Sequence, residues 1–196
     1  MDACDHPDFP ARIAVVISNK RSAFGLERAR KAGIPAVWIP ARKYENRPDH
    51  ESALSKCLFE HQAEWVACAG YMRLLSDSFV GTWKNRILNI HPTLLPAFPG
   101  VDGQGQAHAH GVQIAGVTVH LVDAGCDTGP ILAQGATAAL PDDDREALQQ
   151  RLLKLEHVLF PRALRWAVED RIRVEDGRAT VNLPDGEVRF LWQNPE

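Results

Sequence analysis

Short apolar runs alternate with amphipathic stretches through the first two thirds of the chain, and this alternation constrains the fold most strongly. Four mostly apolar runs predict buried strands at residues 13–17, 36–39, 65–69 and 87–90. Helical patterns lie between them: residues 24–32 before Gly33, a helix capped by Asp49 that ends near His61, and a short helix opened by Ser76. This order predicts an α/β fold, with a Rossmann-like, mostly parallel sheet and helices on both faces.

The pattern changes in the last third of the chain. Residues 117–122 and 131–138 alternate polar and apolar side chains, which predicts a more exposed, antiparallel extension of the sheet. The acidic run ending at Asp144 can cap a long helix that reaches about Val168. Pro161 is expected to kink or interrupt that helix.

The C-terminal tail has two turn signals, Asp176-Gly177 and Asp185-Gly186, between short apolar stretches. These signals predict a small β meander over residues 171–192. We therefore expect a single domain over residues 1–196 with this terminal β appendage.

Composition and charge restrict the class of protein. The chain is 45% hydrophobic and 24% charged, which is typical of a folded core. Its net charge of -3 argues against nucleic acid or a membrane surface as a partner. Four cysteines, Cys4, Cys57, Cys68 and Cys126, lack metal-binding or disulfide-scaffold spacing, so we expect reduced thiols in a cytoplasmic protein, with Cys68 in the core.

One polar pair lies where a predicted strand ends, in the segment LNIHPTLLPAFPG (88–100). Asn89 and His91 are two positions apart on a strand, so they project to the same side. Ligand sites of open parallel sheets lie at the carboxyl ends of strands. Three prolines restrict the following loop: Pro92, Pro96 and Pro99. From the residues alone, a histidine beside a turn-prone loop is an equally good interpretation.

A second segment, VTVHLVDAGCDTGP (117–130), joins a strand to an acidic loop. Thr118 and His120 share one face of the strand, where they either face a cleft or are partly buried. Asp123 and Asp127 follow in the loop. A metal site is one interpretation, but its spacing is poor, and a turn-forming role for Asp123 is favoured.

Together these segments resemble the phosphoribosylglycinamide formyltransferase family. NIHPTLLPAFPG (89–100) is followed, in the family's order and spacing, by TVHLVDAGCDTGPIL (118–132). SNKRSAFGLERARKAGIP (18–35), AGYMRLLS (69–76) and LEHVLFP (155–161) resemble the same family. The resemblance covers most of the chain, and the combination is highly specific, whereas NIHP alone is only suggestive.

The resemblance implies transfer of the formyl group of 10-formyltetrahydrofolate to the amine of glycinamide ribonucleotide, a step of purine biosynthesis. It places the catalytic residues at Asn89, His91 and Asp127. An amide N–H and an imidazolium suit the oxyanion of the tetrahedral intermediate, and a carboxylate suits the imidazolium and the amine proton. No metal is expected, because the formyl donor is already activated.

The resemblance also implies binding residues. It assigns the folate pocket to Met72, Arg73, Leu74, Leu75 and Asp123. It assigns acceptor binding to Pro92, Gly100 and Glu156. Thr118 and His120, from their shared strand face, are expected to support the site. The alternatives are that Leu74 and Leu75 are core residues and that Glu156 is a surface carboxylate. The partners are small molecules, and we expect a monomer or a homodimer.

One part of the family pattern is missing from the sequence: the first strand and the GxGSN loop that binds the acceptor's phosphate through backbone N–H groups. We expect the domain to be N-terminally incomplete, so that the strands beside the missing one have unpaired backbone groups. Low stability and weak acceptor binding are expected to follow.

Two classes of function remain as alternatives: related folate-dependent enzymes and a protein without catalysis. Formyltetrahydrofolate hydrolases show a second histidine after NIH, where this chain has Pro92, and the formyltransferases that act on tRNA carry a basic C-terminal domain that is not seen here. The other alternative is a catalytically impaired folate-binding remnant.

Overall fold

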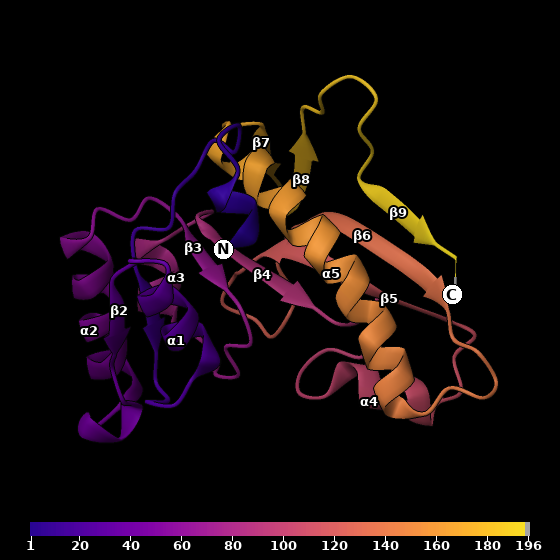
Figure 1. The fold of residues 1–196 in the computed structure, drawn as a ribbon, viewed down its shortest axis with the longest axis horizontal. Coiled ribbons are helices and arrows are strands. Elements are labelled where there is room, and N and C mark those ends of the chain that lie inside the picture. The colour runs from indigo at the N-terminus through magenta and orange to yellow at the C-terminus, as the bar shows by residue number, and fades with distance from the viewer. Residues whose placement is uncertain (195–196) are drawn as a thin grey trace. The chain divides into compact units, whose positions relative to one another are not determined.

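The computed structural model describes residues 1–194 and divides the chain into two compact units. The first unit comprises Met1–Val66 and Leu75–Trp83, and the second comprises Ala67–Leu74 and the chain from Lys84 onward. Figure 1 shows both units as combinations of helices and strands. The predicted α/β class is confirmed.

The first unit is built on a parallel pair of short strands. β1 (Val16–Ser18) pairs with β2 (Ala36–Trp38), and α1 (Phe24–Lys31) connects them and packs on both. Leu26 and Ala29 form the buried side of α1. β1 begins three residues later than the apolar run predicts, because its ladder with β2 starts at Val16.

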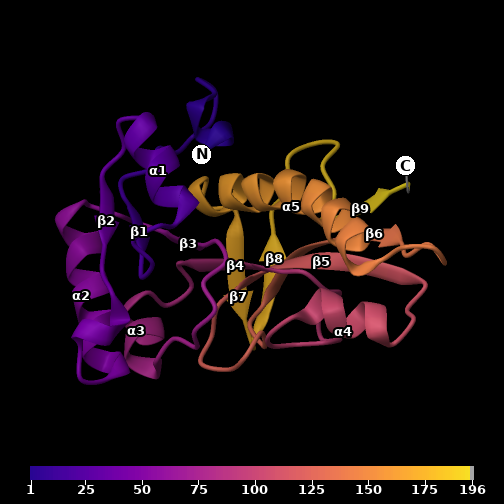
Figure 2. The same ribbon diagram turned by 60° about the horizontal axis from the view of Figure 1, so that its bottom comes forward.

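Two further α-helices complete this unit, with short 3-10 turns at Asp2–Asp5 (η1) and Ala41–Lys43 (η2). α2 (Arg47–Glu60) contacts α3 (Asp77–Thr82), and Figures 1 and 2 draw α1 and α2 on opposite sides of β2. The expected cap at Asp49 is wrong: Asn46 caps α2, and its side-chain oxygen accepts the N–H of Asp49 at 2.9 Å. Ser76 caps α3 as predicted.

The second unit contains the larger sheet, in the order β3-β4-β5-β6-β9. Its strands are β3 (Val66–Cys68), β4 (Ile87–His91), β5 (Ile114–Leu121), β6 (Ile131–Ala138) and β9 (Phe190–Gln193). β5 is antiparallel to β4 and to β6, which confirms the predicted antiparallel pairing. The expected greater exposure is wrong, because most residues of β5 and β6 are buried. Within residues 1–194, β1 pairs only with β2 and β3 only with β4, so both are edge strands.

The long helix α5 (Arg145–Val168) lies along one face of this sheet (Figure 2), where it packs on β5 and β6. Asp144 caps it as predicted, accepting the N–H of Ala147 at 2.8 Å. The apolar side of α5 is fully buried, through Leu148, Leu152, Leu155, Leu159, Ala163 and Trp166. The predicted interruption at Pro161 is wrong: the helix continues through it, because the residues on both sides are anchored on the sheet.

A glycine on β6 sets how closely α5 approaches the sheet. A Cβ atom built on Gly135 would lie 2.6 Å from Cδ1 of Leu159 and 3.1 Å from Cδ2 of Leu155. Both leucines are fully buried on α5. Glycine therefore permits this helix-to-sheet packing without displacement of either leucine side chain.

The tail differs in part from the predicted meander. β7 (Ile172–Glu175) and β8 (Arg178–Val181) form a hairpin at Asp176-Gly177, whose positive φ angles of 48° and 73° are those of a type I′ turn. The third strand, β9, leaves this hairpin and pairs in parallel with β6. Arg189 holds it there, because its guanidinium donates to the carbonyls of Ile131, Leu132 (2.7 Å) and Ala179 (3.1 Å).

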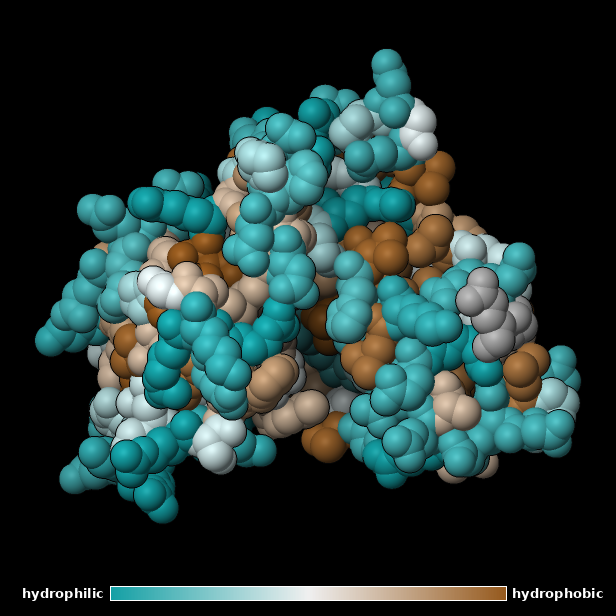
Figure 3. All heavy atoms as spheres, viewed as in Figure 1, coloured by the Kyte–Doolittle hydropathy of each residue, from teal (hydrophilic) through white to brown (hydrophobic). Residues whose placement is uncertain are grey.

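The surface is mixed in character. Figure 3 shows mostly hydrophilic side chains on the viewed face, with separate apolar patches between them. Within the described chain, no helix combines the length and the apolar character that crossing a membrane requires.

Candidate active site

Four polar side chains lie on one face of the β4–β5 pair. In the antiparallel register, Asn89 is opposite His120, and His91 is opposite Thr118. Directly opposed residues of an antiparallel pair project to the same face of the sheet. His91, His120 and Thr118 are each no more than 5% exposed, so this polar group is buried.

Asp127 joins this group from the loop after β5. One carboxylate oxygen, Oδ2, lies 3.4 Å from Nδ1 of His91, and the other lies 3.6 Å from Nε2 of His120. Oδ2 also accepts the backbone N–H of Gly100 at 2.8 Å. Asp127 has a φ of 55°, the left-handed conformation that Asp tolerates better than most residues. The structure thus brings Asn89 and the other two predicted catalytic residues into one cluster.

His120 fixes the orientation of the Asn89 amide. Nδ1 of His120 lies 3.0 Å from the carbonyl oxygen of Leu121, which accepts only, so this nitrogen carries the proton. Burial lowers the pKa of His120 and favours the neutral ring, although the Leu121 hydrogen bond and the Asp127 charge act in the opposite direction. Nε2 therefore accepts an N–H of Asn89 at 3.1 Å. Within residues 1–194, the second N–H of that amide has no hydrogen-bond partner.

His91 has acceptors at both ring nitrogens. Nε2 lies 2.8 Å from the carbonyl oxygen of Phe98, and Nδ1 faces Asp127. Only the doubly protonated ring can donate to both partners. The ring is thus held between two acceptors, with Nε2 on Phe98 and Nδ1 toward Asp127.

The proline-containing loop is held by β5 and β6 rather than by its own turns alone. The hydroxyl of Thr118 donates to the carbonyl of Thr93 at 2.7 Å and accepts the N–H of Leu95 at 3.0 Å. Gln134 donates to the carbonyl of Leu95 and to the Thr118 hydroxyl, both at 3.0 Å. Thr118 is thus engaged with the loop, and Gln134 is a loop contact that the sequence patterns did not indicate.

The short helix α4 (Gly103–Ala109) was also not predicted, and its first residue touches the cluster. A Cβ atom on Gly103 would lie 2.5 Å from Cγ2 of Thr93 and 2.9 Å from Nε2 of His91. Glycine is required there because the chain passes against the His91 ring. The run GQGQ is typical of a loop and has no apolar periodicity, so it gave no helical signal.

Asp123 forms the predicted turn that leads to Asp127. Its Oδ1 accepts the N–H of Gly125 at 3.0 Å and the hydroxyl of Thr128 at 2.7 Å, which is an Asx-type turn. Because this turn closes the loop at both ends, it positions the Asp127 backbone for the left-handed conformation described above.

The remaining residues from the sequence prediction differ in exposure. Met72 and Leu74 are 77% and 55% exposed, so Leu74 is not a core residue. Arg73 is exposed, and Leu75 is half-buried. Met72 and Leu74 thus present exposed apolar side chains on the AGYMRLLS segment.

The three predicted acceptor-binding residues are all partly accessible. Pro92 and Gly100 are half-buried, and Gly100 has a φ of 86°. Glu156 is half-buried on α5, and burial raises the pKa of its carboxyl to about 7. Within residues 1–194, this carboxyl has no hydrogen bond or ion pair, so its oxygens remain available as acceptors.

The cysteines occupy different environments. Cys68 is in the core as predicted, and burial raises the pKa of its thiol to about 12. Cys126 is exposed beside Asp127; burial, followed by the carboxylate's charge and hydrogen bond, raises its pKa. Among the described residues, no group of three or more His, Cys, Asp or Glu side chains is arranged to hold a metal ion.

Comparisons with known proteins agree with this geometry. The family model described as formyl transferase matches residues 1–164. The chain is 43% identical over 158 residues to the phosphoribosylglycinamide formyltransferase of Bacillus subtilis, covering 81% of both chains. It is 48% identical over 154 residues to the trifunctional purine biosynthetic protein adenosine-3 of Drosophila pseudoobscura pseudoobscura, covering 79% of this chain but only 11% of that protein.

The structural similarity is equally extensive. The glycinamide ribonucleotide transformylase 1 of Symbiobacterium toebii superposes with a TM-score of 0.90 at 45% identity, covering 92% of this chain and 85% of that one. Sequence and fold thus agree over most of the chain, and the chain belongs to the formyl transferase family.

Proposed function

We propose that this chain transfers the formyl group of 10-formyltetrahydrofolate to the amine of glycinamide ribonucleotide, producing formylglycinamide ribonucleotide and tetrahydrofolate. The observation that carries the proposal is the convergence of Asn89, His91 and Asp127 in one buried cluster. The names of the similar proteins support the same reaction. The reaction belongs to purine biosynthesis and one-carbon metabolism, and we propose that it occurs in the cytoplasm.

The cluster supplies the charges that this reaction needs. The amine nitrogen bonds to the formyl carbon, and negative charge develops on the formyl oxygen. Asn89 donates its free N–H to that oxygen, and the His91 imidazolium stabilises the charge. Because Phe98 occupies Nε2 of His91, the ring acts mainly through its charge in this arrangement. Removal of one oxyanion donor typically costs about 100- to 1000-fold in rate.

Protons move as the intermediate collapses. The bond between the formyl carbon and N10 of the folate breaks, and N10 takes up a proton. The attacking amine loses that same proton, which Asp127 accepts through a water molecule and passes on to N10, since its carboxylate is 14% exposed and reaches solvent.

Both substrates have chemically suitable residues. The apolar side chains of Met72 and Leu74, with Arg73 between them and Leu75 after them, suit the pterin of the folate, and the Asp123 turn lies on the same loop as Asp127. The unpaired carboxyl of Glu156 suits the ribose hydroxyls of the acceptor. Pro92 and Gly100 complete the proposed acceptor site.

The direct test measures loss of 10-formyltetrahydrofolate by the purified chain with and without glycinamide ribonucleotide. We expect loss that depends on the acceptor, and a decrease of about 100-fold or more in Asn89→Ala. Asn182→Ala, which alters an exposed asparagine after β8, is the control and should retain full activity.

Two other outcomes would contradict the proposal. Loss of the formyl group at the same rate without the acceptor would identify a hydrolase. Folate binding without any turnover would identify a folate-binding protein that lacks catalysis.

A further inference from the structure

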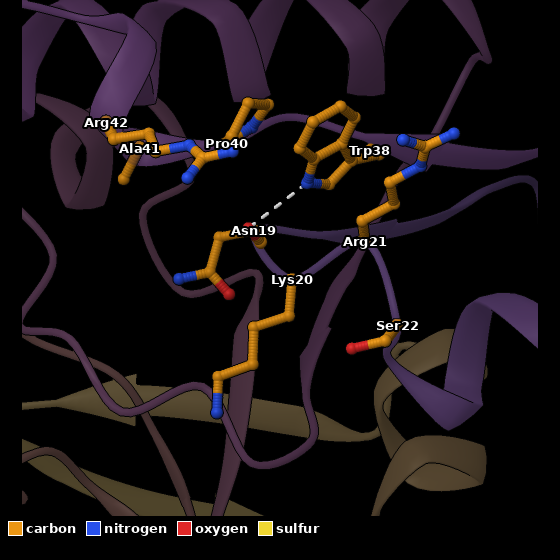
Figure 4. Close-up of a pocket in the computed structure, with 8 residues that line it drawn as sticks. All are labelled: Asn19, Lys20, Arg21, Ser22, Trp38, Pro40, Ala41 and Arg42. Carbon is orange, nitrogen blue, oxygen red and sulfur yellow. Dashed lines mark hydrogen bonds between the residues drawn. The ribbon is translucent and has the colours of Figure 1, made fainter.

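A hollow in the first unit gathers positive charge between two loops. It has a volume of about 410 Å³ and lies between the loop after β1 and the loop after β2 (Figure 4). Sites for small molecules have volumes of about 300–1,000 Å³. The polar and aromatic side chains around it are Asn19, Lys20, Arg21, Ser22, Trp38 and Arg42.

The cations of this hollow lack acidic partners. Within residues 1–194, Lys20, Arg21 and Arg42 form no ion pair with Asp or Glu, and neither does the adjacent Lys43. Residues 18–43 contain seven basic residues and one acidic residue, although the whole chain has a net charge of -3. Like charges that share a concave surface create a positive potential there and attract anions.

Trp38 forms a fixed wall of the hollow. Its indole N–H donates to the carbonyl of Asn19 at 3.3 Å, which connects the two loops (Figure 4). Arg21 and Lys43 lie 5.6 Å and 5.5 Å from the centre of the ring. Such cation–π contacts are weak at exposed positions and leave the N–H donors of both cations available.

We propose that this hollow binds a small phosphorylated molecule through its phosphate oxygens. Lys20 and Arg42 supply the charge, and the Asn19 amide and Ser22 hydroxyl supply neutral donors. The guanidinium of an arginine matches two phosphate oxygens at once, which favours phosphate over a simple monovalent anion. The site goes beyond the proposed formyl transfer, because none of its residues belongs to the Asn89, His91 and Asp127 cluster.

Because all four of these side chains are exposed, the affinity is expected to fall as salt increases. The test titrates the full chain with inorganic pyrophosphate in a calorimeter at low and at physiological ionic strength. We expect saturable binding to one site. The double substitution Lys20→Ala with Arg42→Ala is expected to weaken the affinity about tenfold, since each exposed charge pair contributes up to a few-fold.

A matched control separates the site from the general charge of the protein. Arg30→Ala with Lys154→Ala removes the same total charge at exposed helical positions outside the hollow. It should change the affinity by less than about twofold. A quench of tryptophan fluorescence that disappears in Trp38→Phe would locate the ligand, and equal melting temperatures would show that the variants fold.

Three results would overturn the proposal: no saturable binding of pyrophosphate, equal weakening in the control variant, or citrate binding as tightly as pyrophosphate. The last result would show that the hollow selects negative charge rather than phosphate. The assay reads binding and not turnover, so it should be unchanged in Asn89→Ala, and its failure leaves the proposed reaction untouched.

Discussion

Oδ2 of Asp127 lies 3.4 Å from Nδ1 of His91, although the two residues come from a loop and a strand that are distant in the sequence. The same oxygen accepts the N–H of Gly100, so one carboxylate contacts both the His91 ring and the proline-containing loop. This dual contact makes Asp127 the residue whose replacement is most informative.

Asp127→Asn is expected to lower kcat by about 100-fold or more, because the amide can still accept the Gly100 N–H but no longer balances the imidazolium. Steady-state kinetics measures the decrease. Asp185→Asn, at an exposed turn, is the matched control. Activity above one tenth of the native value in Asp127→Asn would contradict the role assigned to the carboxylate.

His120→Leu is expected to lower kcat by about 10- to 100-fold with little change in KM, since the Asn89 amide loses the acceptor that orients it. His157→Leu, at an exposed position of α5, should behave like the native chain. An unchanged kcat in His120→Leu would show that Asn89 is oriented without this contact.

Gly103→Ala is expected to reduce activity strongly, because a methyl group would collide with Thr93 and the His91 ring. Gly81→Ala is the control, since a Cβ there meets nothing within 4 Å and α3 should gain about 0.5–1 kcal/mol. Circular dichroism and kinetics together test this pair. Equal activity of the two variants would mean that the loop and ring can shift to accommodate the methyl group.

Glu156→Gln is expected to change how stability depends on pH. The folded chain holds the carboxyl with a pKa of about 7, above its ordinary value of 4.5, so burial favours the neutral form. The contribution of the neutral carboxyl to the stability of the fold is complete below pH 4.5 and is lost as the pH rises through about 7. The glutamine variant should therefore gain about 1–2 kcal/mol over the native chain above that range, a value reduced for partial exposure.

Urea unfolding across this pH range measures the difference, with the exposed Glu175→Gln as control. A difference between Glu156→Gln and the native chain that does not vary with pH would show that the carboxyl is not desolvated.

Local signals predicted the elements well. Ser76 and Asp144 cap helices as their positions indicated, because capping depends on contacts only three residues away. The pairing of Asn89 with His91 on one face follows from strand geometry alone. The meeting of both with Asp127 rested on the family resemblance. Asp127 lies 3.4 Å from His91, whereas the Asn89 amide bonds to His120, and the catalytic roles stay predictions.

Contacts between distant segments could not be predicted. Gln134 reaches Leu95 only because β6 lies beside β5, and β9 joins β6 because Arg189 binds carbonyls on that strand. Gly103 has no local signature either: its requirement arises from the His91 ring, which only the folded chain brings close. Sequence periodicity contains no information on contacts between distant residues.

Gly135, which has no side chain beyond hydrogen, affects the position of the proposed acceptor contact. Leu155 and Leu159 rest against this glycine, and Glu156 lies between them in sequence on the same rigid helix. A methyl group at Gly135 would meet the ends of the Leu155 and Leu159 side chains, so these side chains or α5 itself would have to shift. The position of the proposed Glu156 contact therefore depends on how closely α5 packs against Gly135, a residue outside the proposed acceptor site.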